Sequence, residues 1–280
     1  MKIQFTLTVA EGKRLIARAI VSMPEVRKAQ KEGIIMLKGG TTVSAVAEAL
    51  CGEKLRISGR ISPRGTVSAG NTNAPGTHTL ILRRGKPEPG TDRMAEVARE
   101  MGPDDVAICS VNIFDIQGRG AIMAGKDLGG EMGSVYLALE AEGVRCIIPA
   151  GLEKLSPGPV NIASRAAGRK APQWSMGMAV GLIMVPGEII TELEALSILG
   201  YEKHWLIGRG GISGAEGSCT FLVEGEREDL NRLIALVQEM KGAGESGTED
   251  SLPECLHCGP NRLYHRACSL CGKMSLLEEE

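Results

Sequence analysis

The chain has 280 residues, of which 43% are hydrophobic and 24% are charged. This composition is globular, gives material for about two domains, and excludes a disordered, collagen-like or coiled-coil chain. The formal net charge is −2 and only 3% of the residues are aromatic. A nucleic-acid-binding surface needs positive charge and aromatic stacking platforms, so the composition argues against a nucleic-acid partner.

No apolar stretch of the sequence reaches the ~20 residues that a membrane-spanning helix needs. The N-terminal residues alternate in polarity as a strand does, and they lack the basic and then apolar pattern of an export signal. We therefore expect a cytoplasmic protein without a membrane association, and we expect it to form a homo-oligomer.

Residues 1–175 alternate short apolar runs with amphipathic stretches, which predicts an α/β domain with a mainly parallel, Rossmann-like sheet. The predicted buried strands are residues 34–37, 80–82, 106–109 and 146–149. The predicted helices are residues 11–23, 43–51, 93–101 and 132–142, with a break at Pro24. Residues 58–76 are rich in Gly, Ser, Pro, Thr and Asn and are expected to form one long loop.

Residues 176–241 predict a second, smaller unit of ferredoxin-like α+β type. Its expected order is βαββα: a strand at 181–185, a helix from Pro186-Gly187-Glu188 to Gly200, strands at 204–207 and 220–223, and a helix at 227–240. The glycine-rich segment 208–217 lies between two predicted strands, which favours a flexible hairpin loop over a dinucleotide-binding turn. Residues 242–254 have the composition of a flexible acidic linker.

Four cysteines are concentrated in residues 255–280. They form two Cys-x-x-Cys pairs, each followed by glycine: Cys255 with Cys258, and Cys268 with Cys271. Each pair can present two thiolates to one ion, and four thiolates in a tetrahedral array favour Zn²⁺. The segment resembles a zinc ribbon, and a structural rather than catalytic zinc is expected because four cysteines leave no open coordination position. Disulfides and a rubredoxin-like iron site are the alternatives.

A glycine turn follows the first predicted buried strand. Gly39, Gly40, Thr41 and Thr42 stand between that strand and a predicted helix. Backbone N–H groups and hydroxyls at a helix N-terminus form a natural anion site. A tight turn with a threonine helix cap has the same sequence signature, so both interpretations stay open here.

This turn resembles the first βα turn of the superfamily of ribose-5-phosphate isomerase, glucosamine-6-phosphate deaminase and coenzyme A transferase. There a glycine-rich turn that ends in Ser or Thr binds a phosphate. The segment Asp105-Val-Ala-Ile-Cys-Ser-Val-Asn-Ile-Phe-Asp115 is similar to the isomerase pattern Asp-Val-Ala-Ile-Asp-Gly-Ala-Asp-Glu-Ile-Asp. The segment Gly125-Lys126-Asp-Leu-Gly129-Gly130-Glu131 is similar to its Lys-Gly-Gly-Gly-Gly loop. The likeness covers residues 30–150.

The resemblance implies a phosphate-binding role for the turn, helped by Lys126, Gly129 and Gly130. It also implies catalytic carboxylates. Two carboxylates of the isomerase pattern fall on Cys109 and Asn112, so Asp115 and Glu131 are the candidates that this chain offers. Glu153 follows a predicted strand, where α/β sheets place ligand-binding groups, and is a third candidate. His78 follows the long polar loop, although a lone histidine is more often structural.

Two classes of function fit these observations. The first is an enzyme, of isomerase or transferase type, that acts on a small anionic metabolite carrying phosphate or coenzyme A. The second is a non-catalytic ligand-sensing or interaction protein in which the zinc ribbon docks a protein partner. Both use the same predicted pocket.

Overall fold

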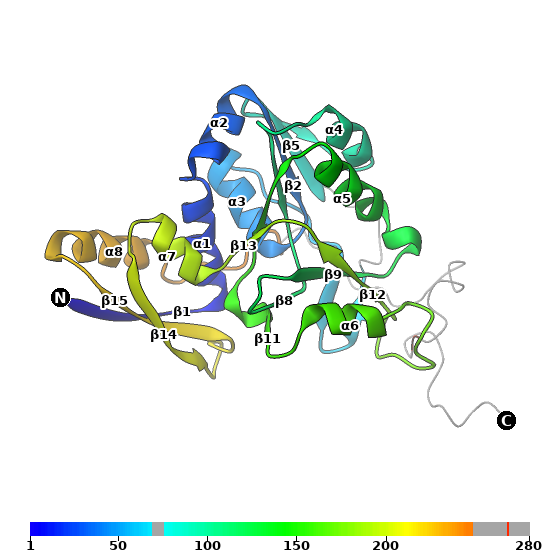
Figure 1. Cartoon of the computed structure of the whole chain (residues 1–280). Coiled ribbons are helices and arrows are strands. Elements are labelled where there is room, and N and C mark those ends of the chain that lie inside the picture. The colour runs from blue at the N-terminus through cyan, green and yellow to red at the C-terminus, as the bar shows by residue number, and fades with distance from the viewer. Residues whose placement is uncertain (69–75, 249–267, 269–280) are drawn as a thin grey trace.

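The computed structural model describes residues 1–68, 76–248 and 268. Figure 1 shows a central sheet with helices on both sides, a second sheet across one end of it, and a third sheet at the N-terminus. The chain is therefore a mixed α/β protein, as its apolar pattern predicts. None of the helices in the described ranges is long and apolar enough to cross a membrane.

The central sheet has six strands in the order β13-β10-β7-β2-β5-β6. Its strands are β2 (Ile34–Lys38), β5 (Thr79–Arg83), β6 (Lys86–Pro89), β7 (Val106–Cys109), β10 (Arg145–Pro149) and β13 (Glu188–Ile190). Strands β2, β7, β10 and β13 run parallel, while β5 and β6 add an antiparallel hairpin at one side. The sheet is thus mixed and partly parallel, with the two most apolar runs, β2 and β7, at its centre.

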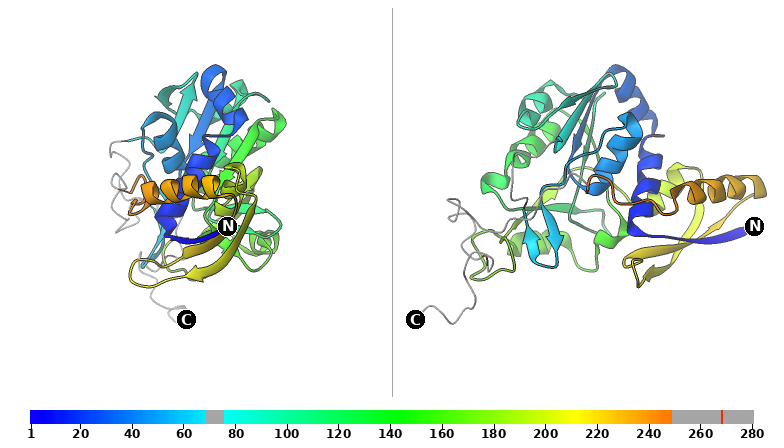
Figure 2. Two further views of the ribbon diagram at one scale, coloured as in Figure 1. Left: turned by 90° about the vertical axis from the view of Figure 1, so that its left-hand side faces the viewer. Right: turned by 180° about the vertical axis from the view of Figure 1, so that it is seen from behind.

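Helices cover both faces of this sheet (Figures 1 and 2). On one face lie α1 (Val9–Ile20), α2 (Pro24–Glu32) and α3 (Thr41–Cys51), and on the other lie α4 (Met94–Glu100) and α5 (Glu131–Ala141). Helix α1 starts with a capping box, in which Thr8 and Glu11 satisfy each other's backbone N–H groups. The break predicted at Pro24 is confirmed, because Pro24 is the first residue of α2.

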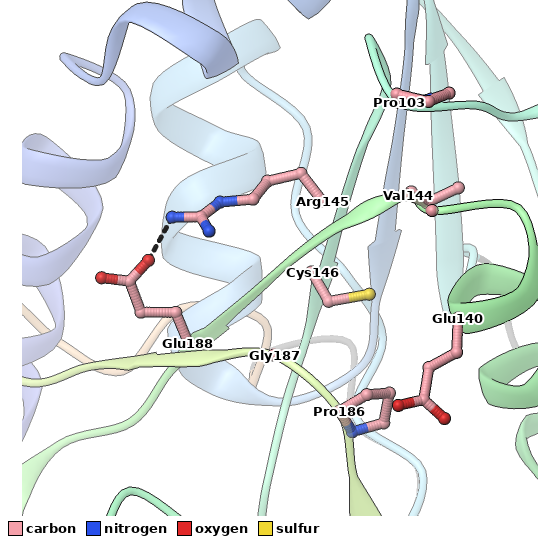
Figure 3. A pocket seen from close by; sticks show the side chains of 9 residues that line it. Pro103, Glu140, Val144, Arg145, Cys146, Pro186, Gly187 and Glu188 are labelled. Atoms are coloured by element: carbon pink, nitrogen blue, oxygen red, sulfur yellow. Dashed lines mark hydrogen bonds and ion pairs between the residues drawn. The ribbon is translucent and has the colours of Figure 1, made fainter.

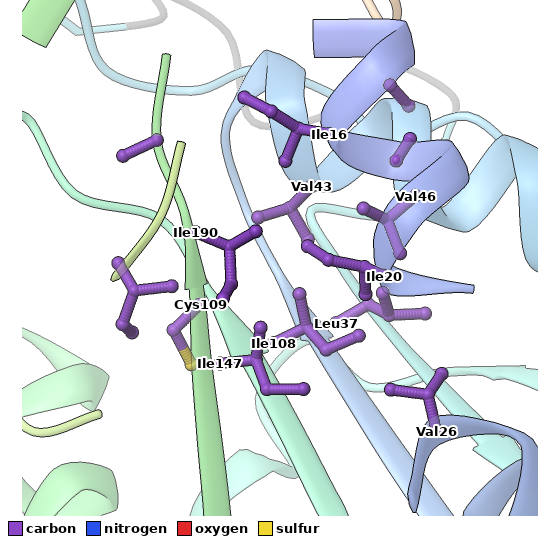
Figure 4. Packing of buried hydrophobic residues seen from close by; sticks show 14 of the residues in the cluster. Ile16, Ile20, Val26, Leu37, Val43, Val46, Ile108, Cys109, Ile147 and Ile190 are labelled. Carbon is purple, nitrogen blue, oxygen red and sulfur yellow. The ribbon is translucent and has the colours of Figure 1, made fainter. Parts of the chain in front are cut away.

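The core fills the space between α1, α3 and the sheet. Figure 4 shows its aliphatic side chains: Ile16 and Ile20 of α1, Val43 and Val46 of α3, and Leu37, Ile108, Ile147 and Ile190 of the strands. Leu37 and Ile108 are fully buried. Each such side chain contributes about 1.5–3 kcal/mol relative to an exposed one, so this layer fixes the sheet beneath the loops that follow its strands.

A second, four-stranded sheet crosses the carboxyl ends of the central strands. Its order is β11-β8-β9-β12, from Leu155–Ser156, Ile113–Asp115, Gly120–Ala124 and Gly181–Val185. Helix α6 (Val160–Ala166) packs on it. The long loop expected at 58–76 instead contains a hairpin, β3 (Arg60–Ser62) with β4 (Gly65–Val67), because Pro63 and Arg64 form a tight turn. Residues 69–75 lie outside the described residues.

The third sheet is antiparallel, in the order β1-β15-β14, and joins the N-terminal strand (Lys2–Leu7) to Ser218–Glu224 and Lys203–Gly210. Helix α8 (Arg227–Met240) packs against it. Phe5 and Phe221 stack with ring centroids 5.6 Å apart. The hairpin predicted across 208–217 is confirmed. The ferredoxin-like βαββα unit predicted for residues 176–241 is therefore wrong in its first strand: residues 181–185 pair with β9 in the second sheet, and the N-terminal strand takes that place beside β15. Periodicity alone does not reveal which distant strands pair.

The helix predicted to open at Pro186-Gly187-Glu188 is wrong at its start. Pro186 and Gly187 form a turn into β13, and α7 (Glu192–Ile198) begins only after the cap at Thr191. Gly187 has φ +127°, and a Cβ there would lie 2.7 Å from the carbonyl oxygen of Cys146. The glycine thus permits the close approach that lets β13 pair with β10.

Residues 242–248, expected to begin a flexible linker, are instead held against α1 and α3. The N–H of Gly242 donates to Glu11 at 2.8 Å, Lys13 pairs with Glu245 at 2.6 Å, and the buried hydroxyls of Ser44 and Ser246 are 2.8 Å apart. Short polar side chains fit this groove between two helices, which is why a polar segment packs there. The remainder of the expected linker, 249–254, lies outside the described residues.

Candidate anion-binding site

The chain leaves the central strands β2 and β7 in opposite directions. From β2 it continues through α3 to β5 on one side, and from β7 it continues through β8, β9 and α5 to β10 on the other. Open α/β sheets bind ligands at such a reversal, at the carboxyl ends of the two strands, and we call this place the crevice. Lys38 and Cys109 are paired across the last position of these strands, so Gly39 and Ser110 enter the crevice together.

The turn between β2 and α3 has a conformation that favours glycine. Gly39 has φ +45° and Gly40 has φ +96°. A Cβ on Gly39 would lie 2.7 Å from Cε1 of His78, and one on Gly40 would lie 2.7 Å from Cβ of Ser110. Side chains are therefore excluded from the turn itself, while His78 and Ser110 pack directly against it.

The N-terminus of α3 presents unsatisfied donors to this crevice. The first N–H of α3 with a backbone acceptor is that of Ser44, bonded to the carbonyl of Gly40 at 2.9 Å. In the part of the chain that the structure describes, the N–H groups of Thr41, Thr42 and Val43 have no acceptor, and Gly40 offers no capping side chain. The buried hydroxyl of Thr42 also has no partner among these residues.

The protonation state of His78, which packs against the same turn, follows from its surroundings. Its Nδ1 lies 2.9 Å from the carbonyl oxygen of Arg56, which can only accept, so Nδ1 carries the proton and Nε2 faces Gly39 with a lone pair. Burial, together with the positive charges of Lys38 and Lys126, lowers the pKa of His78 from 6.5 to about 4. The imidazole is neutral at physiological pH.

Lys126 follows β9, in the sheet that crosses the carboxyl ends of the central strands, and its charge contributes to the lowered pKa of His78. Lys126 precedes a single 3₁₀ turn, Asp127–Gly129, and Gly130 then caps α5. Gly129 and Gly130 both have positive φ, at +75° and +65°. Glu131 is the first residue of α5. The predicted groups Gly39, Gly40, Thr41, Thr42 and Lys126 thus share one edge of the molecule.

Asp115 has a structural environment. Its carboxylate accepts hydrogen bonds from the N–H groups of Gln117, Arg119 and Val160, at 3.1, 3.1 and 2.9 Å, and from Nε of Arg119 at 2.8 Å. Although burial opposes ionisation, these bonds to Arg119 and the backbone lower the pKa of Asp115 from 3.8 to about 2. A carboxylate so occupied closes the β8–β9 turn and fixes the start of α6, and it has no free basic oxygen.

Glu153 belongs to a buried cluster of charges at the end of β10. Its Oε1 lies 3.8 Å from Nζ of Lys13. Beside it, Nζ of Lys154 donates to the carbonyl of Val111 at 2.9 Å, and burial lowers the pKa of Lys154. Glu192 accepts from the N–H of Leu152 at 2.9 Å, and burial raises its pKa to about 7. The cluster joins α1, β10 and α7, and Lys154 connects it to the loop that carries Ser110.

An open cavity of about 710 Å³ lies at the opposite edge of the sheet, where β10 and β13 begin. In Figure 3 the side chains of Arg145 and Glu188 point toward one another and form an ion pair, while the sulfur of Cys146 points away from that pair. Burial and the nearby Glu140 raise the pKa of Cys146 to about 11, so its thiol is protonated. Because the thiolate is the reactive form of cysteine, the protonated Cys146 gives this cavity no reactive thiolate.

Of the four predicted zinc ligands, Cys268 alone lies within the described residues. It is buried and forms an isolated parallel bridge with Ser175. Cys255, Cys258 and Cys271 lie outside the described residues. The described residues contain no group of three or more His, Cys, Asp or Glu side chains that could hold a metal ion.

No protein-family model, curated protein or solved structure matches this chain. The site therefore stands on its own geometry. Sequence reasoning did not include Ser110 among the candidate residues. The signal was present, because Ser110 directly follows the buried strand 106–109, which is the rule that selected Glu153.

Proposed function

We propose that the protein binds a small metabolite through its phosphate, or through the phosphates of a coenzyme A group, in the crevice between β2 and β7. One observation carries this proposal: the N–H groups at the start of α3, which have no acceptor among the described residues, follow the strand end at Lys38 through the glycine turn. The positive charges of Lys38 and Lys126 both act on His78, which packs against this turn. A helix N-terminus, a glycine turn and flanking lysines together favour a bound anion. In this proposal the central sheet serves as a Rossmann-like, cytoplasmic binding unit.

The ligand's phosphate oxygens would accept from the N–H groups of Thr41 and Thr42, and the Thr42 hydroxyl would supply a further donor. Lys126, which is exposed, would pair with the outer oxygens. Neutral His78 would offer Nε2 as an acceptor for a ligand hydroxyl, because its other ring nitrogen is already used. An isomerase- or transferase-type reaction would then take place on the part of the metabolite that extends beyond the phosphate, with Glu131 and Glu153 as the remaining carboxylate candidates.

A pair of substitutions at Thr41 tests the binding step. Glutamate at this first helical position suits the helix N-terminus, but its carboxylate would take the place of the anion and repel phosphate. Glutamine has the same size without the charge. We expect sugar phosphates, nucleotides or coenzyme A esters to raise the melting temperature of the wild type and of Thr41→Gln, and not that of Thr41→Glu. A ligand at 100 times its Kd adds about 2.7 kcal/mol, which is a shift of several degrees.

Two results would overturn the proposal. The first is a wild-type protein that no phosphorylated compound stabilises. The second is an equal rise in melting temperature for both Thr41 variants, because the new carboxylate would not affect a ligand that binds elsewhere. Lys170→Gln, at an exposed lysine, controls for a general loss of positive charge, whereas Lys126→Gln should weaken the response.

The second candidate function, a ligand sensor with a docking module, is favoured by the isolated β-bridge between the backbones of Cys268 and Ser175. Ser175 precedes Gly177, which bridges Thr66 of the β3–β4 hairpin, so the module would contact the segments near the crevice. The four cysteines would hold one structural Zn²⁺. Elemental analysis should find about one zinc per chain, and replacing Cys255 and Cys258 by serine should release it. A zinc-free protein with all four thiols in disulfides would exclude this module.

A further inference from the structure

Among the described residues no strand pairs with the outer edge of β1, whose hydrogen-bonding groups belong to alternate residues. Its other edge pairs with β15 in register, with Ile3 opposite Val223 and Phe5 opposite Phe221. Gly225 donates to the carbonyl of Met1, so the odd-numbered residues face β15. The even-numbered residues Lys2, Gln4 and Thr6 therefore direct their N–H and C=O groups outward. Consistent with this, Lys241 of the segment after α8 reaches the outward carbonyl of Thr6 at 3.4 Å.

A groove of about 380 Å³ runs beside this edge, between β1 and α8. It is lined by Ile3, Gln4, Phe5, Ile234, Val237 and Gln238. Ile3 and Phe5 are half-buried, and Ile234 is 38% exposed. Figure 2 shows β1 at the margin of the small sheet with α8 alongside. The edge thus combines backbone groups that no strand of the described residues pairs with and an apolar floor, which is the arrangement that accepts an added strand.

We propose that this groove binds β1 of a second copy of the chain, antiparallel and centred on Gln4. In that register Gln4 lies opposite Gln4 of the partner subunit, and Lys2 lies opposite Thr6 of the partner subunit. All three outward residues then form hydrogen-bonded pairs, about six hydrogen bonds across the two-fold axis. Centring the pair on Ile3 or Phe5 would use only two of the outward residues.

The side chains agree with this register. Ile3 lies opposite Phe5 of the partner subunit in a non-hydrogen-bonded pair, where side chains come closest, and both point to the groove face beside Ile234. Lys2, the only charged residue of β1, does not lie opposite Lys2 of the partner subunit in this register. A self-complementary strand of this kind specifies a second copy of the same chain.

The outer edge of β14, on the other side of the small sheet, is less suited to such pairing. Its ladder with β15 contains a bulge between Leu206 and Gly208, and it ends in glycines. Bulges and irregular edges prevent strand addition, so the sheet offers one regular edge.

The oligomeric state of the full chain tests the proposal. Sedimentation velocity from about 1 to 100 μM should show a reversible monomer–dimer equilibrium. Gln4→Pro removes the central outward N–H and leaves the β15 ladder intact, and Gln4→Val keeps the N–H in the same place. We expect the proline variant to weaken the dimer at least tenfold and the valine variant to retain it.

Ile234→Glu places a charge in the groove at an exposed position, and Ala235→Glu places the same charge on α8 outside the groove lining. The first should give a folded monomer and the second a wild-type dimer. A wild type that is monomeric at 100 μM, or a dimer unchanged by both Gln4→Pro and Ile234→Glu, would refute the inference. These residues lie apart from the crevice, so the phosphate response tests a separate proposal.

Discussion

Glu192 is a buried carboxyl group whose ionisation should cost stability at neutral and alkaline pH. It is the first residue of α7 and is 3% exposed. Gly12 of α1 packs against it so closely that a Cβ on Gly12 would lie 2.5 Å from its Oε1. Burial, together with the charge of Glu153, raises the pKa of Glu192 from 4.5 to about 7, although the charge of Lys13 opposes the shift. The hydrogen bond from Leu152 also favours the charged form but does not offset burial.

The sign and size of the effect follow from this pKa. Because the folded state binds the proton more tightly than the unfolded state, the group's contribution is fully present below pH 4.5 and is lost as pH rises through 7. A difference of about 2.5 pKa units corresponds to about 3 kcal/mol. Glu192→Gln keeps the volume and the acceptor for Leu152 but removes the charge. We therefore expect it to stabilise the protein by up to about 3 kcal/mol at pH 8.5 and to have little effect at pH 4.5.

Urea unfolding of the two proteins at a series of pH values measures this difference directly, provided the slope with denaturant is unchanged. Glu202→Gln, at an exposed glutamate, controls for the change in net charge and should show no such trend. A stability difference between Glu192→Gln and wild type that is constant from pH 4.5 to 8.5 would refute the reasoning, because it would mean that Glu192 has an ordinary pKa.

Three further predictions concern the crevice and its supports. Gly40→Ala should destabilise the protein by about 2–4 kcal/mol in urea unfolding, because of its φ and the contact with Ser110, and Gly118→Ala, which has open space around it, should cost less. His78 should titrate near pH 4 by NMR and shift upward when phosphate binds, since an anion favours the imidazolium; an unchanged pKa at saturating ligand would separate His78 from the site. Asp115→Asn should lose about 2 kcal/mol or more of stability at pH 7 without changing ligand affinity, and a selective loss of affinity would contradict its structural role.

Much of the central sheet could be predicted from the sequence. The apolar runs at 34–37 and 106–109 can only be buried on both faces, and they form the two central strands. Strand β13 could not be found in this way. It is three residues long and follows Pro186-Gly187, a pair that also opens helices, and its pairing with β10 depends on a close backbone contact between Gly187 and Cys146. Contacts between distant segments decide such short elements.

Part of the candidate site could likewise be predicted from the sequence, and part could not. The glycine turn was predictable because a strand, two glycines and a helix with threonines at its start have a local signature. The role of Asp115 could not be predicted. The sequence does not show whether the oxygens of a carboxylate face a ligand or, as in this protein, accept from the backbone N–H groups of Arg119 and Val160. Ser110 becomes significant only through its contact with Gly40, 70 positions away in the chain.

The distribution of charge along the carboxyl edge bears on whether the protein is an enzyme or a binder. The side at β2 is positive and holds neutral His78, which suits an anion, whereas the side at β10 contains Glu153 and Glu192 with buried lysines. A reaction that needs a base would therefore require a ligand that extends from the phosphate-binding side at β2 to a carboxylate on the side at β10. Lys154 is the physical link, because its ammonium binds the carbonyl of Val111, next to Ser110. Loss of turnover with retained phosphate binding in Glu153→Gln would therefore identify an enzyme, whereas a ligand sensor would keep its full response in that variant.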